Sequence, residues 1–132
     1  MDTHDAARRW AATWQSAWVA HDVEAIAALY APDAVYRSSP YREPEEGGAR
    51  GYVGRVFVDE SEVVCRFGPP LVDGDRAVVE WWASMLDDGE GATLAGTTSL
   101  RFDADGLVVE HLDHWMHAPG RHDPFPGWPG GR

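Results

Sequence analysis

The residues best suited to chemistry lie in one stretch near the C-terminal end of the chain, residues 106–117, GLVVEHLDHWMH. This pattern is typical of a β-strand, whose successive side chains point to opposite faces, so His111, Asp113 and Trp115 share one face. A carboxyl and an imidazole two residues apart on that face are neighbours and form a compact acid/base pair. Asp113 is then the candidate general acid/base, assisted by His111, provided that this face points into the protein. On a face that points into water, the strand carries no chemistry.

Both residues also have a purely structural interpretation. Asp113 would then only hydrogen-bond His111 or a tyrosine hydroxyl, and His111 would be a core histidine with satisfied nitrogens. A metal site is not expected, because His117 lies about 13 Å along the strand from Asp113 and metal ligands must converge. No glycine-rich phosphate loop leads from a strand into a helix, so no nucleotide cofactor is expected either.

Helices precede the strands that must position this face. In the first helix Trp10, Trp14 and Trp18 recur every four residues and form one broad apolar stripe. Asp22 is a good N-cap for the second helix. Two glycines lower the helix propensity of the segment expected to form the third helix. The expected helices cover residues 5–20, 23–30 and 49–59.

Strand signals dominate the second half of the chain. Apolar and polar residues alternate there, and Asp-Gly pairs mark turns. Three helices followed by a long antiparallel meander predict an α+β domain. Its expected form is a cone-shaped barrel, with the three N-terminal helices packed on a curved, mostly antiparallel sheet and a cavity at the wide end. The expected strands cover residues 33–39, 62–67, 71–75, 77–86, 92–102 and 106–117.

Length and composition predict one domain with a short appendage. The 132 residues suit a single domain, which we expect over residues 1–117. Residues 118–132 are rich in proline and glycine and form the expected tail, in which Phe125 and Trp128 are possible anchors. A docked tail would lie over the cavity mouth or across a dimer partner; the alternative is a disordered tail.

Charge and cysteine content limit the partners and the compartment. Eleven basic against 22 acidic residues give a net charge of −11, which argues against nucleic acid and against an anionic membrane surface. The apolar runs are far shorter than the roughly 18 residues of a membrane span, and the charged N-terminus does not resemble a signal peptide. The single cysteine, Cys65, rules out an internal disulfide, so a cytoplasmic location is expected.

Two segments carry a family resemblance: AHDVEAIAALYAPDAVY, residues 20–36, and DGLVVEHLDHW, residues 105–115. Together with the glycine-flanked third helix, they resemble the nuclear transport factor 2-like superfamily, and within it the SnoaL-like proteins. The resemblance covers about residues 6–117. It implies the cone-shaped fold and a homodimer formed through the convex face of the sheet. It leaves the activity open, because the superfamily holds enzymes, binding proteins and transport factors on one scaffold.

The resemblance also shows which catalytic residues of the relatives are missing. It places Trp14 at the catalytic tyrosine of the steroid isomerases, Ser39 at their general base and Thr98 at their protonated aspartate. The epoxide hydrolases carry an arginine and an aspartate on the middle strand, where this chain has only apolar residues around Trp81. Asp113 aligns with the acid on the last strand of the epoxide hydrolases and of the SnoaL-like polyketide cyclases. The resemblance therefore assigns acid/base chemistry to Asp113.

Patterning and resemblance together turn Asp113 inward. The more hydrophobic side of residues 77–86 belongs to the same concave face. Each aromatic residue near it also has the plainer interpretation of core packing. The residues expected to bind a ligand are Trp14, Trp18, Tyr36, Tyr52, Trp81, Met85, Thr98 and Trp115.

The leading prediction is a small-molecule enzyme: a cofactor-independent cyclase, isomerase or hydratase that acts on an apolar or aromatic substrate in an internal cavity. The alternative is a non-catalytic small-molecule binding protein that uses the same cavity. A third interpretation is a scaffold or dimerisation module whose cavity is filled by its own tryptophans.

Overall fold

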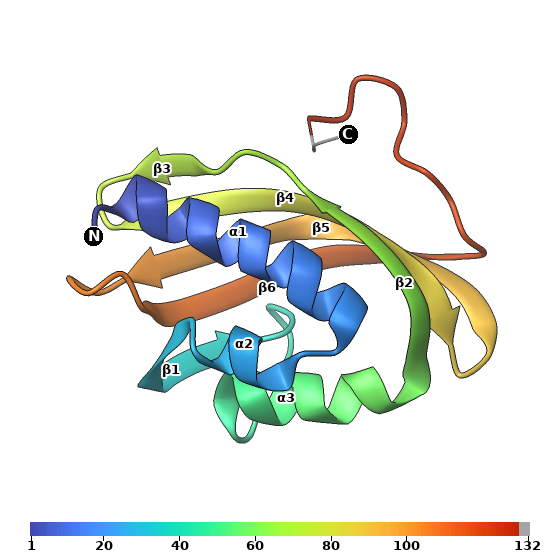
Figure 1. The fold of residues 1–132 in the computed structure, drawn as a ribbon, viewed down its shortest axis with the longest axis horizontal. Helices are drawn as coiled ribbons and strands as arrows, with labels where there is room; N and C mark the ends of the chain where they lie inside the picture. The colour runs from blue at the N-terminus through green and yellow to red at the C-terminus, as the bar shows by residue number, and fades with distance from the viewer. Residues whose placement is uncertain (130–132) are drawn as a thin grey trace.

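The structure, a computed structural model, describes residues 1–129. Helices and strands follow the predicted order, with one strand between the second and third helices and a meander after them (Figure 1). The helical elements are α1 (Thr3–Ala20), α2 (Val23–Ala27), α3 (Gly48–Val56) and the short 3-10 helix η1 (Phe57–Asp59). The strands are β1 (Tyr30–Arg37), β2 (Glu60–Phe67), β3 (Leu71–Asp73), β4 (Arg76–Asp87), β5 (Glu90–Phe102) and β6 (Val108–Pro119).

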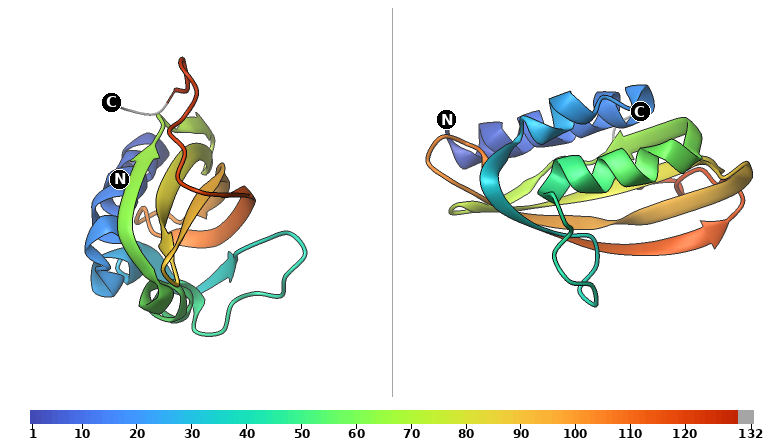
Figure 2. Two further views of the ribbon diagram at one scale, coloured as in Figure 1. Left: turned by 90° about the vertical axis from the view of Figure 1, so that its right-hand side faces the viewer. Right: turned by 90° about the horizontal axis from the view of Figure 1, so that it is seen from below.

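The six strands form one sheet with the order β1-β6-β5-β4-β2, and β3 pairs with β4 outside this path. β1 runs parallel to β6, while the pairings among β2 to β6 are antiparallel. The helices cover one face of this curved sheet (Figure 2). The predicted α+β fold is therefore confirmed, with one refinement. The sheet is open, with β1 and β2 at its edges, and does not close into a barrel.

Helix α1 supplies the aromatic lining of the concave face. The Asp2 side chain caps it by accepting a hydrogen bond from the Asp5 backbone N–H at 2.8 Å. Trp10, Trp14 and Trp18 are all buried against the sheet, as the stripe predicted. Since a buried tryptophan removes about 150–250 Å² from water, these three side chains contribute much of the packing that holds α1 on the sheet.

Helix α2 is shorter than expected, and β1 begins earlier. The helix was predicted to run through Tyr30, but it ends at Ala27 and Tyr30 is the first residue of β1. The backbone N–H of Val108 donates to the carbonyl of Leu29 at 2.9 Å, and Tyr30 then pairs with Val108 in the parallel register. Pairing with a strand distant in sequence therefore ends the helix. It also moves the Tyr30 side chain into the core beside β6.

The register of β4, β5 and β6 sets the geometry of the concave face. A tight turn at Asp88 and Gly89, both with positive φ (52° and 82°), joins β4 to β5. Across the sheet, Thr98 of β5 lies opposite Asp113 of β6. Gly96 lies between two tryptophan-bearing positions of β4 and β6. Side chains on neighbouring strands thus meet at Asp113.

The described part of the tail packs on the outer face of the sheet. Strand β6 runs to Pro119, two residues beyond the expected domain boundary at 117. Beyond it, the Trp82 indole N–H donates to the His122 carbonyl at 2.8 Å, and the Trp82 ring contacts those of Phe125 and Trp128. Trp82 alternates with the inward-facing residues of β4, so residues 120–129 lie away from the cavity. Residues 130–132 of the expected tail lie outside the described part. None of the helices in residues 1–129 is long and apolar enough to cross a membrane.

Candidate functional site

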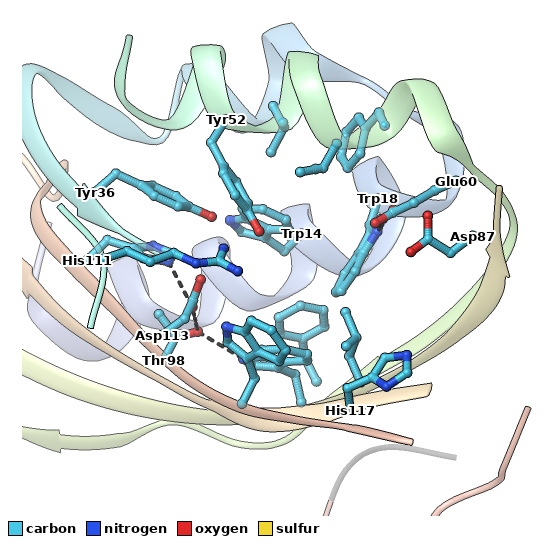
Figure 3. A pocket seen from close by; sticks show the side chains of 18 of the residues that line it. Trp14, Trp18, Tyr36, Tyr52, Glu60, Asp87, Thr98, His111, Asp113 and His117 are labelled. Atoms are coloured by element: carbon cyan, nitrogen blue, oxygen red, sulfur yellow. Dashed lines mark hydrogen bonds and ion pairs between the residues drawn. The ribbon is translucent and has the colours of Figure 1, made fainter. Parts of the chain in front are cut away.

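A pocket of about 480 Å³ lies between the concave face of the sheet and the helices (Figure 3). This volume falls within the range of roughly 300–1,000 Å³ that is common for small-molecule sites. Met85 was predicted to line it but does not: it is buried in the core opposite Ala92, near the β4–β5 turn. The other predicted site residues all line the pocket: Trp14, Trp18, Tyr36, Tyr52, Trp81, Thr98, His111, Asp113 and Trp115.

The Tyr30 hydroxyl is the centre of a buried hydrogen-bond network beneath the pocket. It accepts hydrogen bonds from the indole N–H groups of Trp10 at 3.0 Å and Trp14 at 3.2 Å. These two bonds occupy both lone pairs of the hydroxyl oxygen. Its own proton is therefore donated to the third neighbour, Nδ1 of His111, at 2.9 Å.

That direction determines the tautomer of His111. Because Nδ1 accepts from Tyr30, the ring proton is on Nε2, which donates to Oδ1 of Asp113 at 2.9 Å. The same oxygen accepts from the Thr98 hydroxyl at 2.6 Å, and the Thr98 oxygen accepts from the Trp81 indole at 2.9 Å. Indole N–H groups only donate, so neither chain can run in reverse. Both chains end at Oδ1 of Asp113, which accepts a hydrogen bond from each.

The second oxygen of Asp113 is left for a ligand. Both hydrogen bonds to the carboxylate end on Oδ1, and Oδ2 has no hydrogen-bond partner among residues 1–129. In Figure 3 this oxygen points into the pocket. Asp113 is only 8 % exposed. A carboxylate with one anchored and one free oxygen, shielded from bulk water, is arranged to exchange a proton with a bound molecule.

Two tyrosine hydroxyls reach the same end of the pocket. Tyr36 is 1 % exposed, yet its hydroxyl has no hydrogen-bond partner in the described chain and points into the pocket (Figure 3). Its ring stacks on His111, with 3.8 Å between ring centroids. Burial, followed by the charge of Asp113, raises the pKa of Tyr36 well above its ordinary value. Burial likewise raises the pKa of Tyr52 to about 12. Both side chains are therefore neutral hydrogen-bond donors near neutral pH.

The loop between β1 and α3 adds a cation near these tyrosines. Arg42 lines the pocket, and its guanidinium carbon lies 5.5 Å from the centre of the Trp115 ring. The Trp115 indole N–H donates to the Ser38 carbonyl at 2.6 Å, and Arg42 donates to the Ser38 hydroxyl at 3.1 Å. The charge of Arg42 partly offsets the rise in the pKa of Tyr52. The contact with Trp115, two residues after Asp113 on β6, places the guanidinium near the Asp113 end of the pocket.

The opposite end of the pocket is acidic. Glu60 and Asp87 occupy paired positions of β2 and β4, and Asp59 precedes them in the chain. The Trp18 indole N–H donates to Glu60 at 2.8 Å. Burial, followed by the charges of Asp87 and Asp59, nevertheless raises the pKa of Glu60. Figure 3 shows Glu60 and Asp87 across the pocket from Asp113.

Several features of the site were not predicted from the sequence. Tyr30 and His111 are 81 residues apart in the chain, so no local pattern links them. Glu60, Asp87 and Arg42 lie at a strand start, a strand end and in a loop, where charged residues are common and usually solvated. Only the pairing of β2 with β4 brings the first two together. Within residues 1–129, no three His, Cys, Asp or Glu side chains are grouped so as to hold a metal ion.

Comparisons with solved structures show the fold. SalBIII, described as an epoxide hydrolase/cyclase-like enzyme in pyran ring formation in the polyether salinomycin, is 16 % identical with a TM-score of 0.75, covering 89 % of this chain and 98 % of that one. A hypothetical protein of ketosteroid isomerase-like fold from Catenulispora acidiphila, in complex with trimethylamine, is 19 % identical with a TM-score of 0.68. The match covers 78 % of this chain and 82 % of that protein. RV0760c from Mycobacterium tuberculosis is 17 % identical with a TM-score of 0.69, and the match covers 91 % of this chain and 100 % of RV0760c.

Sequence comparison identifies the family. A search of curated proteins finds no match. The model of the SnoaL-like domain matches residues 7–111, which is most of the chain and includes α1, β1 and the start of β6. Fold and family model agree with the resemblance carried by residues 20–36 and 105–115. The chain belongs to the SnoaL-like domain family.

Proposed function

We propose that this protein is a cofactor-independent acid/base enzyme, of the isomerase or cyclase type, acting on an apolar or aromatic molecule that contains a carbonyl group. One observation carries the proposal. The hydrogen-bond chains from the buried tryptophans run in one direction and end on Oδ1 of Asp113, leaving Oδ2 free in an aromatic pocket. A core aspartate with only a structural role would use both oxygens in hydrogen bonds.

The arrangement suits proton abstraction next to a carbonyl. Oδ2 of Asp113 takes the proton from the carbon, and the electron pair of that C–H bond moves into the carbonyl oxygen. The Tyr36 hydroxyl donates a hydrogen bond to this developing oxyanion. In a substrate with a C=C bond next to the abstracted position, Asp113 then returns the proton to the far carbon of that bond as the carbonyl re-forms, which shifts the double bond. Alternatively, the enolate carbon attacks a second carbonyl carbon of the substrate and closes a ring, while the electron pair of that C=O bond moves to its oxygen, which takes the proton back from Asp113. The substrate supplies both partners of the reaction, so no cofactor enters.

His111 acts through Asp113 in this scheme. Both of its nitrogens are occupied, one by Tyr30 and the other by Asp113, so it does not touch the substrate. It holds the carboxylate in one orientation and keeps Oδ2 directed into the pocket. It is therefore a positioning residue and not a second acid or base.

The same side chains would also serve a non-catalytic binding protein. Both nitrogens of His111 are engaged and the two tyrosines are neutral donors, which leaves Oδ2 of Asp113 as an acceptor that faces the pocket. A carboxylate acceptor beside two hydroxyl donors is also sufficient to bind a polar group of a ligand.

Hydrogen–deuterium exchange into ketones tests the proposal without knowledge of the product. A library of cyclic and aromatic ketones is incubated with the protein in D2O, and deuterium uptake at carbon is measured by mass spectrometry. Asp113→Asn keeps the acceptor oxygen and the shape of the side chain but removes the base. We expect it to lower the exchange rate by about 10²–10⁴-fold. The control is Asp88→Asn, which changes the net charge equally at an exposed turn outside the pocket.

The outcomes separate the two functions. Exchange that is equally fast in wild type and Asp113→Asn contradicts the catalytic role. Ligands that raise the melting temperature of the wild type but never exchange in its presence identify a binding protein instead.

A further inference from the structure

The two ends of the pocket have opposite chemistry. Around Asp113 the pocket offers the hydroxyl donors of Tyr36 and Tyr52 and the guanidinium of Arg42. The other end offers the carboxylates of Glu60, Asp87 and Asp59. A ligand that spans this pocket therefore meets hydrogen-bond donors beside a base at one end, and mainly carboxylate acceptors at the other, where His117 also lines the pocket.

The three carboxylates of the acidic end take part in no ion pair within residues 1–129. Glu60 is partly buried and held by the Trp18 indole, so one of its oxygens is fixed while the other remains free. Asp59 and Asp87 are exposed, so Glu60 is the carboxylate of this group that a cation would stabilise most, because it is partly buried and has no ion-pair partner within residues 1–129.

An independent feature shows that the pocket is built to hold a polar ligand. The Tyr36 residue is 1 % exposed, and its hydroxyl aims into the pocket with no protein partner in residues 1–129. Because this hydroxyl is open to the pocket and has no protein partner, it is available to donate to an acceptor on a ligand. That acceptor lies at the Asp113 end, which orients the ligand with its other end toward Glu60.

Aromatic rings line the path between the two ends. Trp18 packs edge-to-face against Trp14 and Trp81, with 5.8 Å between ring centroids in each pair. Indole faces attract cations, most of all beside carboxylates that face the same space. The Glu60 end thus combines the two elements, carboxylate and indole, that proteins use to bind an ammonium group.

We propose that the ligand is an amphipathic ring compound with a basic amine, whose ammonium group binds between Glu60 and Asp87 beside Trp18 while its oxygen-bearing end lies at Tyr36 and Asp113. The inference deepens the proposed function and takes from it the orientation of the ligand. It also excludes substrates with a carboxylate or phosphate at that end, because these would meet three carboxylates.

A matched pair of probes tests this proposal by binding alone. 2-(2-Naphthyl)ethylamine and 2-(2-naphthyl)ethanol have the same ring and chain length but differ in charge at pH 7. Their dissociation constants are measured by isothermal titration calorimetry for wild type, Glu60→Gln, Asp87→Asn and Asp88→Asn. Asp88 lies next to Asp87 but does not line the pocket, so Asp88→Asn controls for the attraction of any amine to a chain of net charge −11.

We expect the wild type to prefer the amine by about tenfold or more, as for a charge-assisted hydrogen bond. Glu60→Gln, which keeps the acceptor for Trp18, should remove most of this preference, and Asp87→Asn should reduce it. Asp88→Asn should leave it unchanged. Circular dichroism melting shows whether each variant is folded. If Glu60→Gln does not fold, Asp87→Asn provides the test by itself.

Three results overturn the proposal: equal affinity of the two probes for the wild type, a preference that survives both pocket substitutions, or an equal loss in Asp88→Asn. Failure of both probes to bind the wild type overturns it as well. These outcomes are independent of the proposed catalytic role, because the Asp113→Asn exchange experiment measures a rate at the other end of the pocket. An amine preference together with unchanged exchange in Asp113→Asn would keep the amine site and remove the catalysis.

Discussion

Replacing Tyr30 by phenylalanine removes a single oxygen atom, yet three partners lose a hydrogen bond. The indole N–H groups of Trp10 and Trp14 lose their acceptor, and Nδ1 of His111 loses its donor. Each buried polar group left unpaired costs about 1–3 kcal/mol. Even at the lower bound, the three together should reduce the free energy of unfolding by about 3 kcal/mol. This is a large part of the roughly 5–15 kcal/mol that a domain possesses.

Tyr36→Phe is the matched control. Tyr36 is a buried tyrosine on the same strand, but its hydroxyl has no partner in residues 1–129. Its removal should change the free energy of unfolding by less than about 1 kcal/mol, because no protein hydrogen bond is broken. In the proposed reaction the same change removes the donor to the substrate oxygen. Tyr30→Phe should therefore lower stability, and Tyr36→Phe should lower the exchange rate.

Urea unfolding followed by tryptophan fluorescence measures both stabilities. Nitrogen-15 NMR of the histidine rings adds a direct test of the direction of the network. In the wild type, His111 should be the neutral tautomer with its proton on Nε2. Equal losses of stability in the two variants, or a proton on Nδ1 in the wild type, would refute the one-way hydrogen-bond chain to Asp113.

Four further predictions concern other parts of the molecule. Burial raises the pKa of Glu60, so the folded state binds the proton of this carboxyl more tightly than the unfolded chain does. The free energy of unfolding should therefore fall as the pH rises from the pKa of Glu60 in the unfolded chain through its pKa in the folded protein. Glu60→Gln should therefore melt at a higher temperature than the wild type at pH 7, and the difference should vanish in acid, below the ordinary pKa of glutamate; a lower melting temperature at pH 7 would contradict this. Burial raises the pKa of Cys65 to about 12, so Ellman's reagent at pH 8 should label this thiol only after unfolding. A Cβ at Gly96 would lie 2.1 Å from the His114 carbonyl oxygen, so Gly96→Ala should lower the urea midpoint, whereas alanine at Gly54, which has open space, should not produce this clash. If the outer face of the sheet forms the expected homodimer, Met116→Asp, at a position 79 % exposed on that face, should convert the dimer to a monomer in analytical ultracentrifugation; a monomeric wild type would remove the dimer prediction.

Local sequence periodicity was enough to predict the elements that carry the site. A repeat of tryptophans every four residues places Trp10, Trp14 and Trp18 on one helix face, whatever lies opposite. Alternation in the last strand makes His111 and Asp113 neighbours on one face, and their hydrogen bond is present in the structure. These relations depend on backbone geometry over a few residues, so the chain alone determines them.

Where distant segments meet, the sequence was insufficient. Periodicity extended α2 through Tyr30, whereas pairing with β6 draws this residue into β1 and beneath His111. Met85 has the same alternation as Trp81, and only the course of the strand past the pocket separates a core residue from a lining one. In both cases contacts over long sequence separations outweigh the local preference, which is worth less than about 1 kcal/mol per residue.

For Asp113, too, the sequence determined one part of the site and the tertiary structure determined the other. The sequence determined that an acid and a histidine lie side by side on a strand facing tryptophans. Only the tertiary structure decided which atoms donate, because the direction of each hydrogen bond depends on Tyr30, Thr98 and Trp81, which reach Asp113 from other strands. The physical reason is that strand periodicity determines which face a side chain occupies, whereas its hydrogen-bond partners depend on the register between strands.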